Sequence, residues 1–226
     1  MRGEIPAFAR MKMKLKVCGM KYKENLEAVA SLRPDYLGFI FYKKSARHFD
    51  SNMPELSKLI KKVGVFVDEK LETVKDTIEK FNLQAVQLHG SESPDYCSQL
   101  NNVEVIKVFS IKDEFNFNVL QPYEDVCDYF LFDTKGKLPG GNGYTFNWNV
   151  LNHYPSTKPY FLSGGIGLHE IENIKSFKES PASKYCYAID VNSKFEIEPG
   201  LKNIEELEKF ITHLSFRTRC GIHNEN

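Results

Sequence analysis

The chain has 226 residues, of which 42% are hydrophobic, so it can form one large α/β domain or two small ones. Lysine plus arginine and aspartate plus glutamate both total 30, and this zero net charge argues against nucleic acid or an anionic membrane as a partner. The five cysteines are scattered and include no Cys-x-x-Cys pair. This pattern predicts reduced thiols in a cytoplasmic protein.

Three segments are expected along the chain. Residues 1–13 lack the continuous apolar core of a secretory signal, and no stretch of the sequence is long and apolar enough to span a bilayer. Met11 and Met13 precede the first predicted strand, so the ordered domain should begin near Lys14. We therefore expect an N-terminal extension at 1–13, a folded domain at 14–214 and a C-terminal tail at 215–226.

Short runs rich in β-branched and aromatic residues alternate with longer segments whose apolar residues have helical spacing. In chain order, the predicted strands are 15–18, 36–41, 63–67, 85–88, 105–108, 129–132, 160–162 and 187–189. The predicted helices are 25–32, 54–61, 71–81, one begun by Ser93 and Pro94, 114–121, a short one near Trp148, 169–177 and 204–213. Eight such units of about 25 residues predict a parallel sheet closed into a single (β/α)₈ barrel, an α/β fold.

An open doubly wound sheet is the alternative, because it has the same local pattern. Its dinucleotide fingerprint is missing, since the nearest match, GIGLHE, has Glu170 where the third glycine is needed. A Walker A loop is also absent, because Gly136-Lys137 is followed by leucine. The zinc motif H-E-x-x-H fails at Asn173. We therefore predict neither a cofactor nor a metal ion.

In a (β/α)₈ barrel the catalytic groups lie at the C-terminal ends of the strands. Several of the predicted strands end in reactive or glycine-rich sequence. These ends are Cys18-Gly19, the stretch FYKKSARHF that contains Arg47, QLHG with His89, Asp133-Thr134-Lys135-Gly136, SGGI with Gly164 and Gly165, and Asp190-Val191-Asn192-Ser193.

Seven motifs at these positions resemble the phosphoribosylanthranilate isomerase family of tryptophan biosynthesis, which performs an Amadori rearrangement. They are KVCGM, LGFIFYKKSARHF, VGVFV, VQLHGSE, FDTKGKLPGGNG, FLSGGI and IDVNSKFEIEPGLK, and the resemblance covers 14–211. Asn147 stands where family members often have aspartate, and Asn192 where the phosphate loop often has serine. Both are small polar replacements that keep the backbone donors.

The resemblance implies a reaction that opens the furanose ring of N-(5′-phosphoribosyl)anthranilate and removes a proton from the sugar C2′. It assigns the acid to Asp133 and the base to Cys18. A free thiol has a pKa of about 8.5 and an aspartate about 3.9, so each pKa must be displaced for its role. We expect kcat/KM to have a bell-shaped pH dependence.

The loops after strands seven and eight often bind phosphate in such barrels, which points to Gly164, Gly165, Asn192 and Ser193. Arg47 is the candidate for the anthranilate carboxylate, because a guanidinium binds a carboxylate with two donors.

Two further residues have open roles. Asp190 resembles a family residue near the substrate, but an aspartate there would equally orient loop amides. His89 either lines the pocket or satisfies a buried hydrogen bond. The glycine-rich loop 135–143 suggests a lid.

Two rival functions remain at this point: another sugar-phosphate barrel enzyme, and a barrel that binds phosphate or anthranilate ligands without turnover. The expected partner is the small-molecule substrate phosphoribosylanthranilate, and the expected assembly is a monomer or a homodimer.

Overall fold

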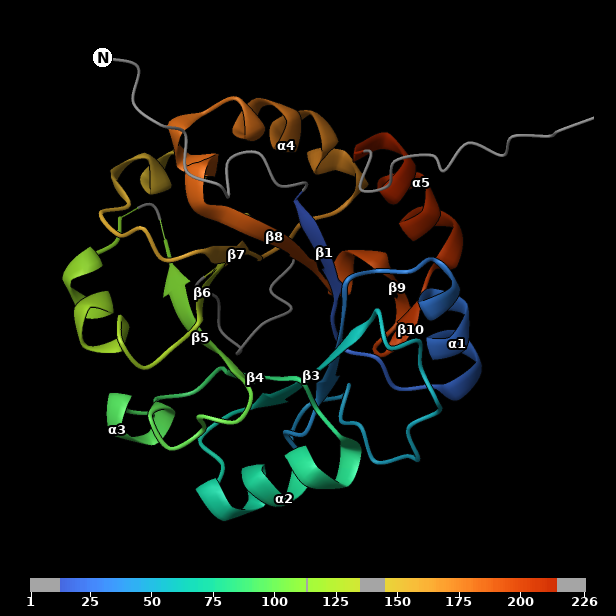
Figure 1. The fold of residues 1–226 in the computed structure, drawn as a ribbon. Coiled ribbons are helices and arrows are strands. Elements are labelled where there is room, and N and C mark those ends of the chain that lie inside the picture. The colour runs from blue at the N-terminus through green and yellow to red at the C-terminus, as the bar shows by residue number, and fades with distance from the viewer. Residues whose placement is uncertain (1–12, 113, 135–144, 215–226) are drawn as a thin grey trace, which may run out of the picture.

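The computed structural model describes residues 13–112, 114–134 and 145–214. Within these residues eight parallel strands form a closed barrel in the order β1 to β8, with helical segments around it (Figure 1). The strands are β1 Lys14–Val17, β2 Tyr36–Ile40, β3 Lys61–Phe66, β4 Ala85–Leu88, β5 Glu104–Ile111, β6 Tyr129–Thr134, β7 Tyr160–Leu162 and β8 Cys186–Val191. The predicted (β/α)₈ barrel is confirmed.

Some of the predicted segments lie outside the described residues. These are the N-terminal extension apart from Met13, the tail at 215–226 and the lid at 135–143. No helix in the described part of the chain is long and apolar enough to cross a membrane.

The helical segments follow the strands, but several are short. The α-helices are α1 Lys23–Ser31, α2 Leu71–Phe81, α3 Pro94–Cys97, α4 Ile171–Lys178 and α5 Ile204–Leu214. The 3-10 helices are η2 Phe117–Tyr123, η3 Trp148–His153, η4 Leu168–Glu170, η5 Pro181–Tyr185 and η6 Ser193–Phe195. The predicted start of α3 is confirmed, because the Ser93 hydroxyl accepts the Tyr96 N–H and Pro94 is the first helical residue.

Two predicted helices are wrong. Residues 54–61 contain no helix, because the apolar spacing there did not mark a buried face: Leu59 is 86% exposed. The segment lies against the barrel as irregular chain, and Lys61 already begins β3. The predicted helix 114–121 is instead the 3-10 helix η2, because β5 runs on to pair Ile111 with Thr134 and Pro122 lies inside the helical turn.

Alternation along the strands separates two apolar cores. The larger core lies between the strands and the surrounding segments. The smaller one consists of side chains on eight residues of the barrel strands: Tyr36, Val63, Ala85, Ile106, Val108, Leu131, Phe161 and Ala188. Further along these strands, buried polar side chains continue the same alternation, among them Gln87, Asp133 and Asp190, and β1 adds the buried Lys16. The residues that line the cavity described below continue from this polar layer.

A small hairpin that the sequence did not indicate follows β8. It consists of β9 Glu196–Glu198 and β10 Leu201–Lys202, which pair in antiparallel fashion. In Figure 1 the hairpin lies between the barrel and α1. It carries Glu196 and Lys202, whose buried side chains take part in the site described next.

Candidate active site

One cavity of about 700 Å³, measured to its open mouth, is lined by all nine residues that the sequence analysis named as candidate site residues. Its lining includes Cys18, Arg47, His89, Asp133, Gly164, Gly165, Asp190, Asn192 and Ser193. Ile40, Val65 and Ile166 add apolar wall to these polar groups. Residues from the ends of seven different strands or their following loops thus meet at one opening.

Cys18 follows directly after β1 and is 3% exposed. Its N–H donates to Val191 O at 2.9 Å, which continues the β1–β8 pairing by one residue. Two glycines make room around it. A Cβ at Gly38 would lie 2.7 Å from the Cys18 Sγ, and Gly19 has φ +75° with the side chain of Asn192 so close that a Cβ would be 2.6 Å from its Oδ1. The chain therefore turns away and leaves the thiol at the cavity wall.

Charged groups surround this thiol below the cavity. Lys16 is fully buried, and its Nζ lies 2.8 Å from Asp190 Oδ1. Burial raises the pKa of the Cys18 thiol, while the positive charges of Lys16 and Lys202 act in the opposite direction. Burial alone would lower the pKa of Lys16, but the charges of Asp190 and Cys18 raise it, so this lysine stays protonated.

Asp190 is held on both of its oxygens. Oδ1 accepts from Lys16 and Oδ2 accepts from the Ser163 hydroxyl at 3.2 Å. Burial raises the pKa of the Asp190 carboxyl, and Lys16 opposes this rise. Both residues of this pair are buried, so the pair forms a polar floor under Cys18.

Asp133, at the end of β6, lies beside His89 from the end of β4. The Asp133 Oδ1 accepts the Thr134 N–H at 2.9 Å, and Oδ2 lies 3.5 Å from His89 Nε2. The other ring nitrogen of His89 is 3.3 Å from Gln87 Nε2. His89 thus lines the cavity and lies beside two buried polar side chains.

Arg47 enters the cavity already paired. Its Nε lies 2.9 Å from both carboxylate oxygens of Glu196, and Nη2 lies 2.6 Å from Oε2. Lys202 Nζ shares the same carboxylate at 2.7 Å and also bonds Asn192 Oδ1 at 2.8 Å. Two cations therefore share one anion. Of the five guanidinium N–H groups, two face Glu196, which leaves three for a ligand.

The glycine pair after β7 shows why these positions lack side chains. Gly164 has φ +91° and Gly165 has φ +67°. A Cβ at Gly164 would lie 2.6 Å from the Thr134 backbone nitrogen, so the chain passes close to the end of β6. After the neighbouring strand β8, Ser193 begins η6 directly after Asn192.

Four polar residues of the site were missed at the sequence level: Lys16, Gln87, Glu196 and Lys202. Lys16 had a detectable signal, because a lysine two residues before Cys18 in an apolar strand lies on the same side as the thiol. Gln87 bears the same relation to His89. Glu196 and Lys202 had none, because their places depend on the hairpin. Among the described residues, no group of three or more His, Cys, Asp and Glu side chains is placed to hold a metal ion.

Comparison with known proteins supports a family assignment. A family model described as N-(5′-phosphoribosyl)anthranilate (PRA) isomerase matches residues 15–213. A protein of that name from Phocaeicola vulgatus is 40% identical over 204 residues, which are 89% of this chain and 98% of the relative. The chain belongs to this family. As a member of it, the protein is an isomerase of tryptophan biosynthesis.

Solved structures of the family share the fold. The phosphoribosyl anthranilate isomerase from Thermotoga maritima has a TM-score of 0.74 and 30% identity, with 90% of this chain and 98% of that chain covered. A family structure in complex with reduced 1-(o-carboxyphenylamino)-1-deoxyribulose 5-phosphate has a TM-score of 0.70 and 25% identity over the same shares.

Proposed function

We propose that this protein converts N-(5′-phosphoribosyl)anthranilate to 1-(2-carboxyphenylamino)-1-deoxyribulose 5-phosphate, with Asp133 as general acid and Cys18 as general base. The observation that carries the proposal is that a thiol from β1 and a carboxyl group from β6 line one cavity with cations and glycine-rich loops. The ligand named for the family complex contains a carboxyphenyl group, a sugar and a phosphate. The cavity offers a candidate partner for each.

The proposed reaction needs one proton donated to the substrate and one proton removed from it, and it uses no cofactor. Asp133 protonates the furanose ring oxygen as the bond from C1′ to that oxygen breaks, and the anilino nitrogen forms an iminium ion. The Cys18 thiolate then takes the proton from C2′, and the C–H electrons form the C1′=C2′ bond of an enaminol. The enaminol then gains a proton at C1′ and loses the proton of its 2′-hydroxyl group, which gives the ketone, so the overall change is an isomerisation.

The charges around Cys18 support its role as base. Lys16 lies beneath the thiol and Lys202 beside it, and both act to lower its pKa against the effect of burial. Removal of water by a bound substrate would strengthen these interactions. Asp190 holds Lys16 in place through the 2.8 Å contact, and we propose that it also lies near the substrate.

Arg47 is proposed to bind the anthranilate carboxylate with its three remaining N–H groups. The change Arg47→Ala is expected to raise KM about tenfold or more with a smaller change in kcat, because one charge-assisted contact in the bound state is lost. Steady-state kinetics measure this. Glu196 keeps its contact with Lys202, so the variant leaves no isolated buried charge.

Lys44→Ala, an exposed change on the same loop, is the matched control for Arg47. An unchanged KM in Arg47→Ala would remove this residue from the binding site, whereas an equal rise in both variants would point to a general effect of charge.

The phosphate is proposed to bind at Gly164, Gly165, Asn192 and Ser193. Crystals grown with sulfate or phosphate are expected to show the anion beside these residues, and inorganic phosphate is expected to compete with substrate. Gly164→Ala should weaken this competition, because a Cβ there displaces the loop from Thr134. An anion bound at a wholly different place, with competition unaltered in the variant, contradicts the assignment.

The decisive assay of the function follows the loss of anthranilate-type fluorescence from freshly made substrate. Turnover by the wild-type protein supports the isomerase. Binding of the substrate without turnover supports the ligand-binding rival. Turnover of the related aminosugar phosphate of histidine biosynthesis alone supports a different sugar-phosphate enzyme.

Three further proposals accompany this function. We propose that 14–214 is the catalytic domain, flanked by an extension at 1–13 and a tail at 215–226. We propose a cytoplasmic location, which the free thiols of Cys18, Cys97, Cys127 and Cys186 support. A monomer or a homodimer is proposed as the assembly, and one family structure is described as monomers generated from a dimeric isomerase of Thermotoga maritima.

A further inference from the structure

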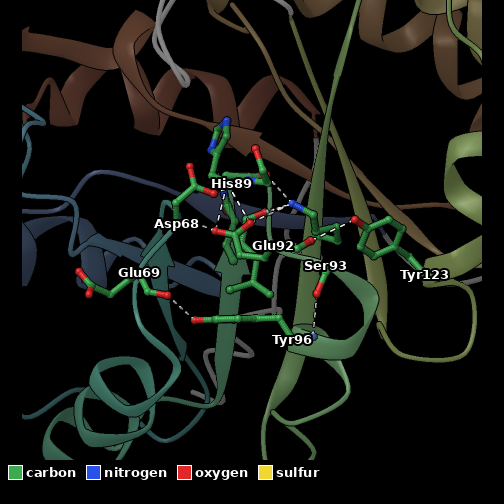
Figure 2. Close-up of polar contacts among 12 residues, drawn as sticks. Asp68, Glu69, His89, Glu92, Ser93, Tyr96 and Tyr123 are labelled. Carbon is green, nitrogen blue, oxygen red and sulfur yellow. Dashed lines mark hydrogen bonds and ion pairs between the residues drawn. The ribbon is translucent and has the colours of Figure 1, made fainter.

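A buried ion pair lies under the loop that carries His89 and is not used in the mechanism above. Glu92 follows β4 and Lys107 lies in β5, and both are almost completely inaccessible to solvent. Lys107 Nζ lies 3.0 Å from Glu92 Oε2. Figure 2 shows Glu92 at the centre of a set of polar contacts, with His89 above it.

Lys107 fixes the backbone on both sides of His89. Its Nζ donates to Leu88 O at 3.2 Å and to Gly90 O at 2.7 Å. The His89 N–H itself donates to Phe66 O at 2.8 Å, which extends the β3–β4 pairing to this residue. The peptide groups around His89 are therefore tied to both neighbouring strands.

Glu92 ties the same segment to the loop after β3. Its carboxylate accepts the Gly90 N–H at 3.0 Å and the Asp68 N–H at 2.9 Å. The two loops approach so closely that a Cβ at Gly90 would lie 2.6 Å from the Asp68 nitrogen. The Tyr123 hydroxyl donates to Glu92 O at 3.0 Å and so adds η2 to the set, as Figure 2 shows.

This pair is a poor source of stability. Two charges lose their hydration when buried, and a well-packed apolar pair of similar volume is often as stable or more stable. An ion pair has directional partners here, because the carboxylate and the ammonium contact each other and also make five hydrogen bonds to backbone atoms of the two loops beside His89. Apolar side chains would make none of them.

We propose that Glu92 and Lys107 are positioning residues that hold His89 with its Nε2 against Asp133, and that this contact keeps the acid oriented toward the cavity. This inference rests on the proposed function, because it takes Asp133 as the acid. Within the described part of the chain, the Asp133 Oδ1 accepts from the next residue and its Oδ2 faces His89. A displaced ring would therefore remove the contact that orients Oδ2.

A double-mutant cycle tests the inference. Glu92→Gln is expected to lower kcat about tenfold or more with KM changed less than about twofold, because misplacement of a catalytic group affects the chemical step. In a His89→Ala background the same change is expected to lower kcat less than about threefold, since the side chain through which Glu92 acts is gone. Equal losses in both backgrounds overturn the inference.

Two controls separate positioning from folding. Glu104→Gln removes one partner of the Lys61–Glu104 ion pair at the start of β5, and it should leave kcat unchanged. The double change Glu92→Met with Lys107→Met removes both charges, so neither is left buried without its partner, and it should still lose activity as Glu92→Gln does. A Met/Met variant with wild-type kcat overturns the inference.

A spectroscopic readout does not depend on activity. In the wild-type protein, Asp133→Asn is expected to shift the ¹H–¹⁵N signals of the His89 ring, because the two groups are in contact. In the Glu92→Gln background this shift is expected to vanish.

The outcomes separate the two proposals. If the wild-type protein shows no turnover but the shift of the His89 signals depends on Glu92 in this way, the proposed function fails and the positioning role stands. If turnover is present and Asp133→Asn still shifts the His89 ring signals in the Glu92→Gln background, only the positioning role of Glu92 and Lys107 is contradicted.

Discussion

Cys18→Ala and Asp133→Asn are each expected to lower kcat by about 10²- to 10⁴-fold, the range that a single general acid or base contributes. Alanine cannot take the C2′ proton, and asparagine cannot give one to the ring oxygen. Substrate affinity should change much less, because the proposed phosphate and carboxylate contacts involve other residues of the cavity. Single-turnover fluorescence measurements, together with equilibrium binding, separate these two effects.

Cys97→Ala is the matched control for the thiol. Cys97 is a buried cysteine on α3 and does not line the cavity, so its replacement removes the same atom from a packed site. We expect it to affect stability and to leave kcat near wild type. A Cys18→Ala variant that keeps most of the wild-type kcat would exclude the thiol as base, and the acid and base would then have to be sought among Asp133, His89 and Asp190.

Lys16→Met is expected to raise the pKa that the kcat/KM profile reports for the Cys18 thiol by about 1–3 units, the usual effect of an opposite charge at contact distance. The sign follows from the cause. Burial raises the pKa of Cys18 and the charge of Lys16 opposes it, so loss of that charge raises this pKa further. Because the thiolate is the proposed base, activity at a fixed neutral pH falls about tenfold for each unit.

Asp190→Asn tests the same electrostatics with the opposite sign. The negative charge of Asp190 adds to the rise in the pKa of Cys18, so its removal should lower the pKa that the kcat/KM profile reports for this thiol, whatever happens to the maximum rate. Since Lys16→Met alone leaves Asp190 without its ion-pair partner, the double variant Lys16→Met with Asp190→Asn checks the fold. Profiles that shift in the same direction in both single variants would contradict a charge effect on the thiol.

The charged groups that face Cys18 come from three elements, which limits the alternatives. Lys16 lies on β1, Asp190 on β8 and Lys202 on β10. Lys202 also contacts Glu196 and Asn192. Burial lowers the pKa of Lys202, and the charge of Glu196 acts in the opposite direction. Lys16 has the more direct geometry, because it lies two residues before the thiol on the same strand.

The barrel could be predicted from local pattern because strands and helices differ in the period of their apolar residues, and that period is a property of neighbouring residues. The wrong prediction of a helix at 54–61 has the same origin, because it also relied on local apolar spacing alone. A few apolar residues at helical spacing do not determine whether a segment has a partner to bury them against, and Leu59 has none. The extent of β5 likewise depended on its pairing with β6 rather than on its own residues.

The position of the site could also be predicted, since the fold places the C-terminal ends of parallel strands at one mouth. The strand–helix alternation, the reactive residues that end the strands and the motifs of the family could all be read from the residues in order. The ion-pair partners could not: Lys16 with Asp190, Arg47 with Glu196 of the hairpin, and Glu92 with Lys107 beneath His89. An ion pair depends on the distance between groups that are far apart in the chain, and only the closed barrel sets that distance.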